Sequence, residues 1–165
     1  LEFLATRDPM TGCLNRRAFF ALADVEWARS ARSQRPLSVI AADIDFFKKV
    51  NDSFGRHVGD LVIKDYALRA SHMLRLPDIL ARFGGEEFII LLPETGLKEA
   101  CQVAERIRRE VEKRQDKALP PYTVSLGVAV ANAGHGDFSD LQALLAHADA
   151  ALYKAKQGGR NRVAH

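Results

Sequence analysis

Two groups of acidic residues give this sequence its candidate chemistry. Glu86 and Glu87 follow a Gly-Gly pair, Gly84 and Gly85, that separates two apolar runs. Such a pair between apolar runs is typical of a tight β-hairpin. Glycines let a bulky ligand approach the backbone at the hairpin tip, and adjacent carboxylates can hold a hard cation such as Mg²⁺. The pattern equally fits an ordinary surface hairpin with solvated glutamates, because Gly-Gly turns are common.

The second acidic group stands at the end of a run of β-forming residues, 37–42. Asp43 and Asp45 follow this run, and Lys48 comes shortly after them. A carboxylate at a strand end can hold Mg²⁺ that bridges phosphate oxygens, and a lysine can neutralise a terminal phosphate. A strand that simply stops at a polar turn would explain one Asp but not the matching acids on the hairpin.

Composition indicates one globular domain. The 165 residues suffice for one hydrophobic core but hardly for two, and the net charge of +3 is too mild to indicate a nucleic acid polymer as a partner. No apolar run reaches the ~20 residues of a membrane span, so we expect no membrane contact by this domain. Cys13 and Cys101 form no CxxC pair, so a cytoplasmic location is the simplest expectation, although the parent protein could be membrane-anchored.

Hydrophobic periodicity predicts helices interleaved with strands around one sheet. Asn15 is expected to cap a helix that runs to about Ser33, because its side chain can accept hydrogen bonds from early amide groups. The expected strands cover residues 37–43, 79–83, 87–92 and 122–130. The other expected helices cover 57–74, a segment that begins near Gly96, and a last segment that carries an apolar stripe from Leu141 to Leu152; a loop is expected at 131–137.

Five ordered motifs resemble those of the GGDEF domain, the diguanylate cyclase family. The central motif is Gly84–Phe88, and the others are Asp8–Arg17, Asp43–Asp52 with Gly59 and Asp60, Thr123–Ala129 and Ala148–Arg162. Five motifs with matching order and separation are far more specific than one short match. The resemblance implies an α+β fold with a central, mostly antiparallel five-stranded sheet flanked by helices, similar to nucleotidyl cyclases and polymerase palms. It also implies that residues 1–165 form a single catalytic domain.

The resemblance implies that two GTP condense to cyclic di-GMP with release of two pyrophosphates, with Mg²⁺ (or Mn²⁺) as cofactor. The implied metal ligands are Asp43, the carbonyl of Ile44, Glu86 and Glu87, and the implied catalytic residues are Glu86 and Lys48. The Glu86 position has been cast as the base for the ribose 3′-hydroxyl, but a plain carboxylate is a weak base at pH 7 and metal activation could act instead.

Asn51 and Asp60 resemble the family's guanine-reading pair. A carboxylate can accept from guanine N1 and N2, and an amide can donate to O6 or N7. Asn51 and Asp52 could instead cap the following helix. Arg56 and His57 stand where the family usually has a His directly after the glycine, which affects the packing of this loop.

The implied phosphate contacts come from Lys48 and from the backbone amides of Phe46 and Phe47, with Gly84 and Gly85 at the hairpin also in contact with substrate. The two phenylalanine rings are expected to be core anchors.

Lys156 and Arg160 are also implied to bind the triphosphate. They lie one helical turn apart and would share a face if the helix continued that far, although a solvated basic helix end is the usual alternative.

Arg75 and Asp78 resemble the family's inhibitory R-x-x-D site, because five residues separate Asp78 from Gly84 as in the family. The resemblance implies that this pair binds cyclic di-GMP as product and inhibitor. A surface ion pair is the usual meaning of so short a pattern.

The reaction consumes two GTP, whereas the chain carries one set of reacting groups, so a transient homodimer of half-sites is expected. The first residue is Leu, and we interpret the chain as part of a longer protein in which residues 1–7 end a helix from an upstream sensory or regulatory domain. Two alternatives remain open: an inactive GGDEF domain that acts as a cyclic di-GMP receptor, and a GTP-binding regulatory module.

Overall fold

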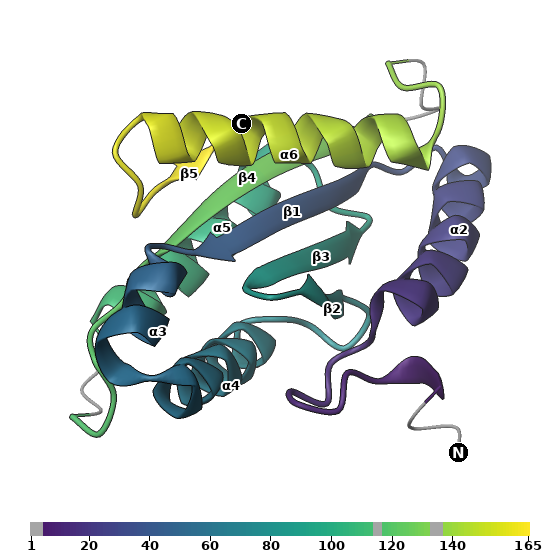
Figure 1. The fold of residues 1–165 in the computed structure, drawn as a ribbon. Helices are drawn as coiled ribbons and strands as arrows, with labels where there is room; N and C mark the ends of the chain where they lie inside the picture. Colours follow the sequence, from purple (N-terminus) through teal and green to yellow (C-terminus); the bar gives the residue numbers. More distant parts are fainter. Residues whose placement is uncertain (1–4, 114–116, 133–136) are drawn as a thin grey trace.

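A computed structural model describes residues 5–113, 117–132 and 137–165, which form a five-stranded sheet with helices on both faces (Figure 1). The strand order is β2-β3-β1-β4-β5, and every neighbouring pair is antiparallel except β4 and β5. The strands are β1 (Leu37–Ile44), β2 (Ile79–Gly84), β3 (Glu87–Pro93), β4 (Val124–Ala131) and β5 (Val163–Ala164). The helices are α2 (Arg16–Ser33), α3 (Phe47–Phe54), α4 (Arg56–His72), α5 (Leu97–Glu112) and α6 (Leu141–Gln157). The expected α+β fold is confirmed.

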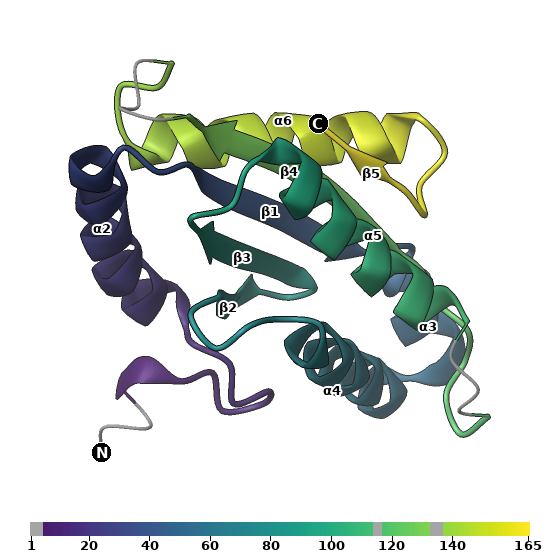
Figure 2. The same cartoon turned by 180° about the vertical axis from the view of Figure 1, so that it is seen from behind.

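The central strand β1 is buried along its whole length, because β3 and β4 flank it and helices cover both of its faces. Val39 and Ala41 belong to a core that includes residues of α2 and α6, whereas Ile40 and Ala42 belong to a core that includes residues of α4 and α5. Figure 1 shows α6 across the near side of β1 and β4, and Figure 2 shows α5 on the opposite side. The alternation of side chains along β1 therefore builds two cores from one continuous apolar run.

The Gly-Gly hairpin forms as predicted and brings Gly84 opposite Glu87. Gly84 has φ 144° and Gly85 has φ 50°, values that favour glycine over residues with a Cβ. Arg82 donates from Nε to the Gly85 carbonyl at 2.9 Å and from Nη1 to Oδ1 of Asp8 at 3.1 Å. The hairpin tip is thus fixed to the loop that precedes α2.

The predicted elements are found with small changes at their ends. Asn15 caps α2 by accepting from the Ala18 amide at 2.9 Å, as expected. The helix expected at 57–74 covers Arg56–His72, and the strand expected from residue 122 begins at Val124. The expected loop at 131–137 lies partly, and residues 1–4 of the expected upstream helix lie wholly, outside the described residues.

Two short elements, α3 and β5, are not among the elements that hydrophobic periodicity predicts, although the family resemblance implies a fifth strand. Gly55, with φ 90°, separates α3 from α4 and takes the N-cap position of α4. Asn51 and Asp52 lie inside α3, so the alternative that they cap the next helix is wrong. Over the described ranges, we find no helix with the length and apolar character that crossing a bilayer would need.

Candidate active site

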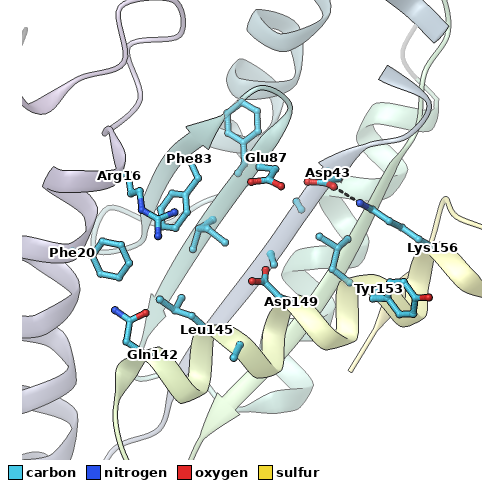
Figure 3. Close-up of a pocket in the computed structure, with 16 residues that line it drawn as sticks. Arg16, Phe20, Asp43, Phe83, Glu87, Gln142, Leu145, Asp149, Tyr153 and Lys156 are labelled. Carbon is cyan, nitrogen blue, oxygen red and sulfur yellow. Dashed lines mark hydrogen bonds and ion pairs between the residues drawn. The ribbon is translucent and has the colours of Figure 1, made fainter. Parts of the chain in front are cut away.

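The carboxylates of Asp43 and Glu87 come together because β1 and β3 pair these two residues in register. Asp43 is only 6% exposed. Its Oδ2 accepts a hydrogen bond from the Lys156 ammonium group of α6 (Figure 3), whereas its buried Oδ1 has no hydrogen-bond partner among the described residues. Register partners on neighbouring strands point to the same face of a sheet. This pairing therefore creates an acidic pair next to one ammonium group.

A cavity of about 400 Å³ lies over this acidic pair, between α2 and α6. Figure 3 shows Arg16 and Asp149 directed into it. The Arg16 guanidinium lies 4.7 Å from the centre of the Phe83 ring and 5.4 Å from that of Phe20, within cation–π range. Arg16 and Asp149 fall within the motifs quoted above but received no predicted role, because only the packing of α2 and α6 brings them to the acidic pair.

The cavity concentrates negative charge. Partial burial, with the nearby Asp43, Glu86 and Asp149 carboxylates, raises the pKa of Glu87. Burial and the nearby Asp43 likewise raise the pKa of Asp149. Both shifts disfavour the charged form, so a cation that enters this cavity would relieve a real electrostatic cost.

The predicted metal ligands only partly converge. Among the described residues, no three His, Cys, Asp or Glu side chains form a ready-made metal site. Glu86 is partly exposed at the hairpin tip and does not line the cavity, and the Ile44 residue is buried at the end of β1. The structure thus brings Asp43 and Glu87 together, with Lys156 where a cation would bind.

The turn between β1 and α3 carries the residues that were predicted to bind phosphate. Phe46 has φ 53° and provides no side-chain cap for α3, so the amides of the first turn, which includes Phe47 and Lys48, are open to an anion. The Lys48 side chain is exposed. The Phe47 ring packs against the core as expected, whereas the Phe46 ring is 60% exposed, so its predicted role as a core anchor is wrong. The Arg160 guanidinium lies 4.6 Å from the centre of the Phe46 ring.

Lys156 and Arg160 do not share a helical face. Helix α6 ends at Gln157, and Arg160 lies in the following loop with φ 64°. Lys156 nevertheless reaches Asp43 from the last turn of α6, and Arg160 reaches Phe46 from the loop. The two cations converge on the end of β1 by a route that helical spacing does not predict.

Asn51 and Asp60 lie on the neighbouring helices α3 and α4. The Asn51 side chain packs against Gly59, and its buried Oδ1 lacks a hydrogen-bond partner in the described part of the chain. Asp60 is partly exposed. Asn51 thus packs against the residue that precedes Asp60, and one amide oxygen between the two helices lacks a hydrogen-bond partner among the described residues.

Arg75 and Asp78 form an ion pair at 2.9 Å in which the Asp78 side chain is 1% exposed. Arg75 also donates to the Pro93 carbonyl and to Oγ1 of Thr95, both at 3.0 Å. The ion pair that so short a pattern usually indicates is therefore present. The pair lines a cavity of about 990 Å³ that is separate from the one over Asp43.

The fold and the acidic hairpin define a nucleotide-cyclase-like class of domain. A family model described as "Diguanylate cyclase, GGDEF domain" matches residues 5–162. The chain therefore belongs to the GGDEF family of diguanylate cyclase domains.

Three known proteins illustrate the similarity. The response regulator PleD of Caulobacter vibrioides is 41% identical over 97% of this chain, which spans 36% of the length of PleD. The crystal structure of the GGDEF domain of DgcB from Caulobacter crescentus, in complex with c-di-GMP, has a TM-score of 0.85 and 35% identity, over 97% of this chain and 95% of that one. The structure of the active GGEEF domain of a diguanylate cyclase from Vibrio cholerae also has a TM-score of 0.85, with 36% identity over 92% of this chain and 96% of that one.

Proposed function

We propose that this domain is an active diguanylate cyclase that condenses two GTP into cyclic di-GMP and two pyrophosphates. The observation that carries the proposal is the buried Asp43 carboxylate paired in register with Glu87 on a complete Gly84–Phe88 hairpin. The active GGEEF domain of a diguanylate cyclase from Vibrio cholerae supports this proposal, because residues 84–88 of the present chain have the same sequence, GGEEF.

The residues at this position fit a Mg²⁺ (or Mn²⁺) ion. The buried Oδ1 of Asp43 lacks a partner within the described ranges, and Glu87 supplies a second hard oxygen donor beside it. The proposed set is completed by Glu86 and the Ile44 carbonyl. A bound ion would neutralise charge on the phosphates and make the ribose hydroxyl easier to deprotonate.

Lys156 is proposed to change partner when substrate binds. Its ammonium group holds Oδ2 of Asp43, so it competes with any cation for that carboxylate. A lysine released from Asp43 would lie beside the turn that begins α3, where Lys48 and Arg160 already present positive charge. The ion pair would thus offset the buried Asp43 charge when no cation is bound, and Lys156 would become a phosphate ligand when substrate binds.

Guanine is proposed to bind at Asn51 and Asp60. The Asp60 carboxylate would accept from guanine N1 and N2, groups that have no donor equivalent in adenine. The Asn51 amide would donate to O6 or N7 of the same base. GTP should therefore be strongly preferred over ATP.

Catalysis is proposed to need two copies of the domain. The described residues offer one acidic pair and one phosphate turn, so each copy would direct the 3′-hydroxyl of its GTP to the α-phosphate held by the other. The chain spans about a third of PleD, which supports the proposal that a further domain of the parent protein brings two copies together. Specific activity of the isolated domain should rise with protein concentration.

A turnover assay with GTP and Mg²⁺ tests the proposal. The parent domain should release pyrophosphate and form cyclic di-GMP, and Glu86→Gln should abolish both while the thermal midpoint stays near that of the parent. Glu99→Gln, at an exposed position on α5, is the matched control and should keep full activity. A parent domain that binds cyclic di-GMP but never turns over GTP would show that the receptor alternative is correct.

A further inference from the structure

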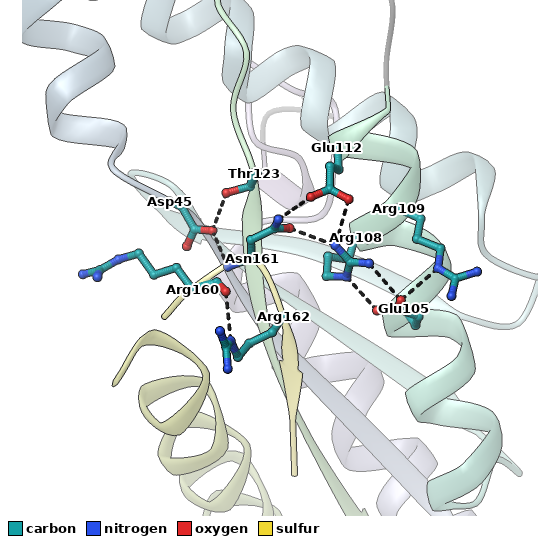
Figure 4. Close-up of polar contacts among 9 residues, drawn as sticks. All are labelled: Asp45, Glu105, Arg108, Arg109, Glu112, Thr123, Arg160, Asn161 and Arg162. Carbon is teal, nitrogen blue, oxygen red and sulfur yellow. Dashed lines mark hydrogen bonds and ion pairs between the residues drawn. The ribbon is translucent and has the colours of Figure 1, made fainter. Parts of the chain in front are cut away.

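A polar network joins the loop after α6 to α5 through the side chain of Asn161 (Figure 4). The Asn161 Oδ1 accepts from Nη1 of Arg108 at 3.0 Å, and its Nδ2 donates to Glu112. Its backbone N–H donates to Oδ2 of Asp45 at 3.0 Å. The side-chain amide of Asn161 is thus held by Arg108 and Glu112 of α5, and its backbone is held by Asp45 in the turn after β1.

Asp45 is a rigid anchor at one side of this network. It is buried, and its carboxylate also accepts from Oγ1 of Thr123 at 2.7 Å and from Oγ of Ser125 at 2.6 Å. Charge-assisted hydrogen bonds of this kind are short and strong. Its predicted structural role is consistent with these contacts, which connect the loop to the ends of β1 and β4.

Arg108 is fixed at the other side. Its side chain is 15% exposed, and it donates to Glu105 at 2.7 and 2.9 Å and to Glu112 at 3.2 Å. These hydrogen bonds, above all those to Glu105, raise the pKa of Arg108 further above its ordinary value. The guanidinium group therefore presents a permanently charged donor to Asn161 in one orientation.

The network holds a strained piece of backbone. Arg160 has φ 64° and Asn161 has φ 46°, so two consecutive residues that carry a Cβ lie in the left-handed region. Asn tolerates this region better than most residues, whereas Arg enters it only where its surroundings impose it. This backbone conformation directs the Arg160 side chain over the Phe46 ring, at the turn that begins α3.

We propose that Asn161 and Arg108 are positioning residues that hold Arg160 at the phosphate turn. Neither residue needs to touch the nucleotide. The inference rests on the proposed function, because it assumes that Arg160 binds the triphosphate of GTP. The contribution of Arg160 to triphosphate binding would then depend on the contact between Asn161 and Arg108 of α5, which lies outside the acidic pair.

The test compares ligands with and without the terminal phosphates. Asn161→Gly keeps the left-handed backbone accessible but removes both side-chain hydrogen bonds, and Arg108→Gln removes the charged donor. Each variant should bind a non-hydrolysable GTP analogue about tenfold more weakly, as expected for a lost charged contact, while GMP affinity stays within about twofold of the parent. Arg109→Gln is the matched control: Arg109 also pairs with Glu105, but its side chain is 70% exposed and makes no hydrogen bond to Asn161 in the described structure.

The variant Arg160→Ala tests the proposed phosphate contact separately from the positioning role of Asn161 and Arg108. If Arg160→Ala leaves the affinity for the GTP analogue unchanged, the proposed phosphate contact and the inference both fail. If Arg160→Ala weakens this affinity but Asn161→Gly and Arg108→Gln do not, only the positioning inference is overturned. If all three weaken it, the combination of Asn161→Gly with Arg160→Ala should be no weaker than Arg160→Ala alone. Should Asn161→Gly fail to fold, Arg108→Gln decides, since its expected loss is the same.

Discussion

The contact between Asn51 and Gly59 permits a test in which function and stability change differently. A Cβ added at Gly59 would lie 1.8 Å from Oδ1 of Asn51, 3.0 Å from its Cγ and 3.3 Å from Cζ of Phe47. The first contact is with the end of a side chain and not with backbone, so Asn51 would have to rotate while α3 and α4 stay in place. Gly59→Ala therefore removes the predicted guanine contact without changing Asn51 itself.

The expected stability change is small because two effects oppose each other. Alanine in a helix interior is more favourable than glycine by about 1 kcal/mol. Overpacking at a buried position costs about 1–3 kcal/mol. The net decrease in the free energy of unfolding is therefore about 2 kcal/mol or less. The lost hydrogen bond to the base should instead lower GTP affinity by about 10- to 100-fold, since hydrogen bonds in buried recognition sites contribute about 1.5–3 kcal/mol when a charged or unsatisfied group is left behind.

Isothermal titration with a non-hydrolysable GTP analogue and urea unfolding measure the two effects on the same samples. Asn51→Ala should weaken binding to the same extent, and the double variant should be no weaker than either single one. Gly127→Ala is a contrasting control, because its Cβ would meet the backbone of α6, 2.1 Å from Leu152 N and 2.4 Å from Ala148 O, and the fold should be strongly destabilised. If Gly59→Ala retains parental affinity and the parental preference for GTP over ATP, Asn51 does not read guanine from this position.

Three further outcomes are expected. Lys156→Met should bind Mn²⁺ more tightly than the parent in the absence of nucleotide, because no ammonium group competes for Asp43; equal or weaker binding, measured by electron paramagnetic resonance, would contradict the proposed exchange. The raised pKa of Asp149 means that the folded state binds this proton more readily than the unfolded state, so stability falls as pH rises through the shifted pKa. Asp149→Asn should thus raise the thermal midpoint near pH 7 but not near pH 3, in metal-free buffer, and a lower midpoint near pH 7 would refute this sign. Arg75→Ala should relieve inhibition by cyclic di-GMP without lowering the initial rate, and a parent domain that shows no calorimetric binding of cyclic di-GMP would remove the basis for an inhibitory role of Arg75 and Asp78.

Local sequence patterns determined the elements whose information lies within a few residues. The Gly-Gly pair predicted the hairpin because the positive φ values of Gly84 and Gly85 are accessible to glycine at little cost. Asn15 marked the start of α2 because an N-cap needs only its own side chain and the next turn. The apolar run 37–42 predicted the central strand, because a strand that is buried on both faces carries apolar side chains on both. The family motifs then assigned candidate roles to residues within these elements.

Only the tertiary structure decided how residues from distant segments meet. The register of β1 against β3 brings Asp43 beside Glu87, and the packing of α6 brings Lys156 to the same carboxylate. Helical spacing failed for Arg160, because α6 ends at Gln157 and the following backbone is left-handed. Neither local propensity nor motif spacing predicts these contacts, because every one of them depends on the packing of elements that are far apart in the chain. The candidate residues could therefore be identified from the sequence. The ion pair between Lys156 and Asp43, and the placement of Asp43 beside Glu87, could not.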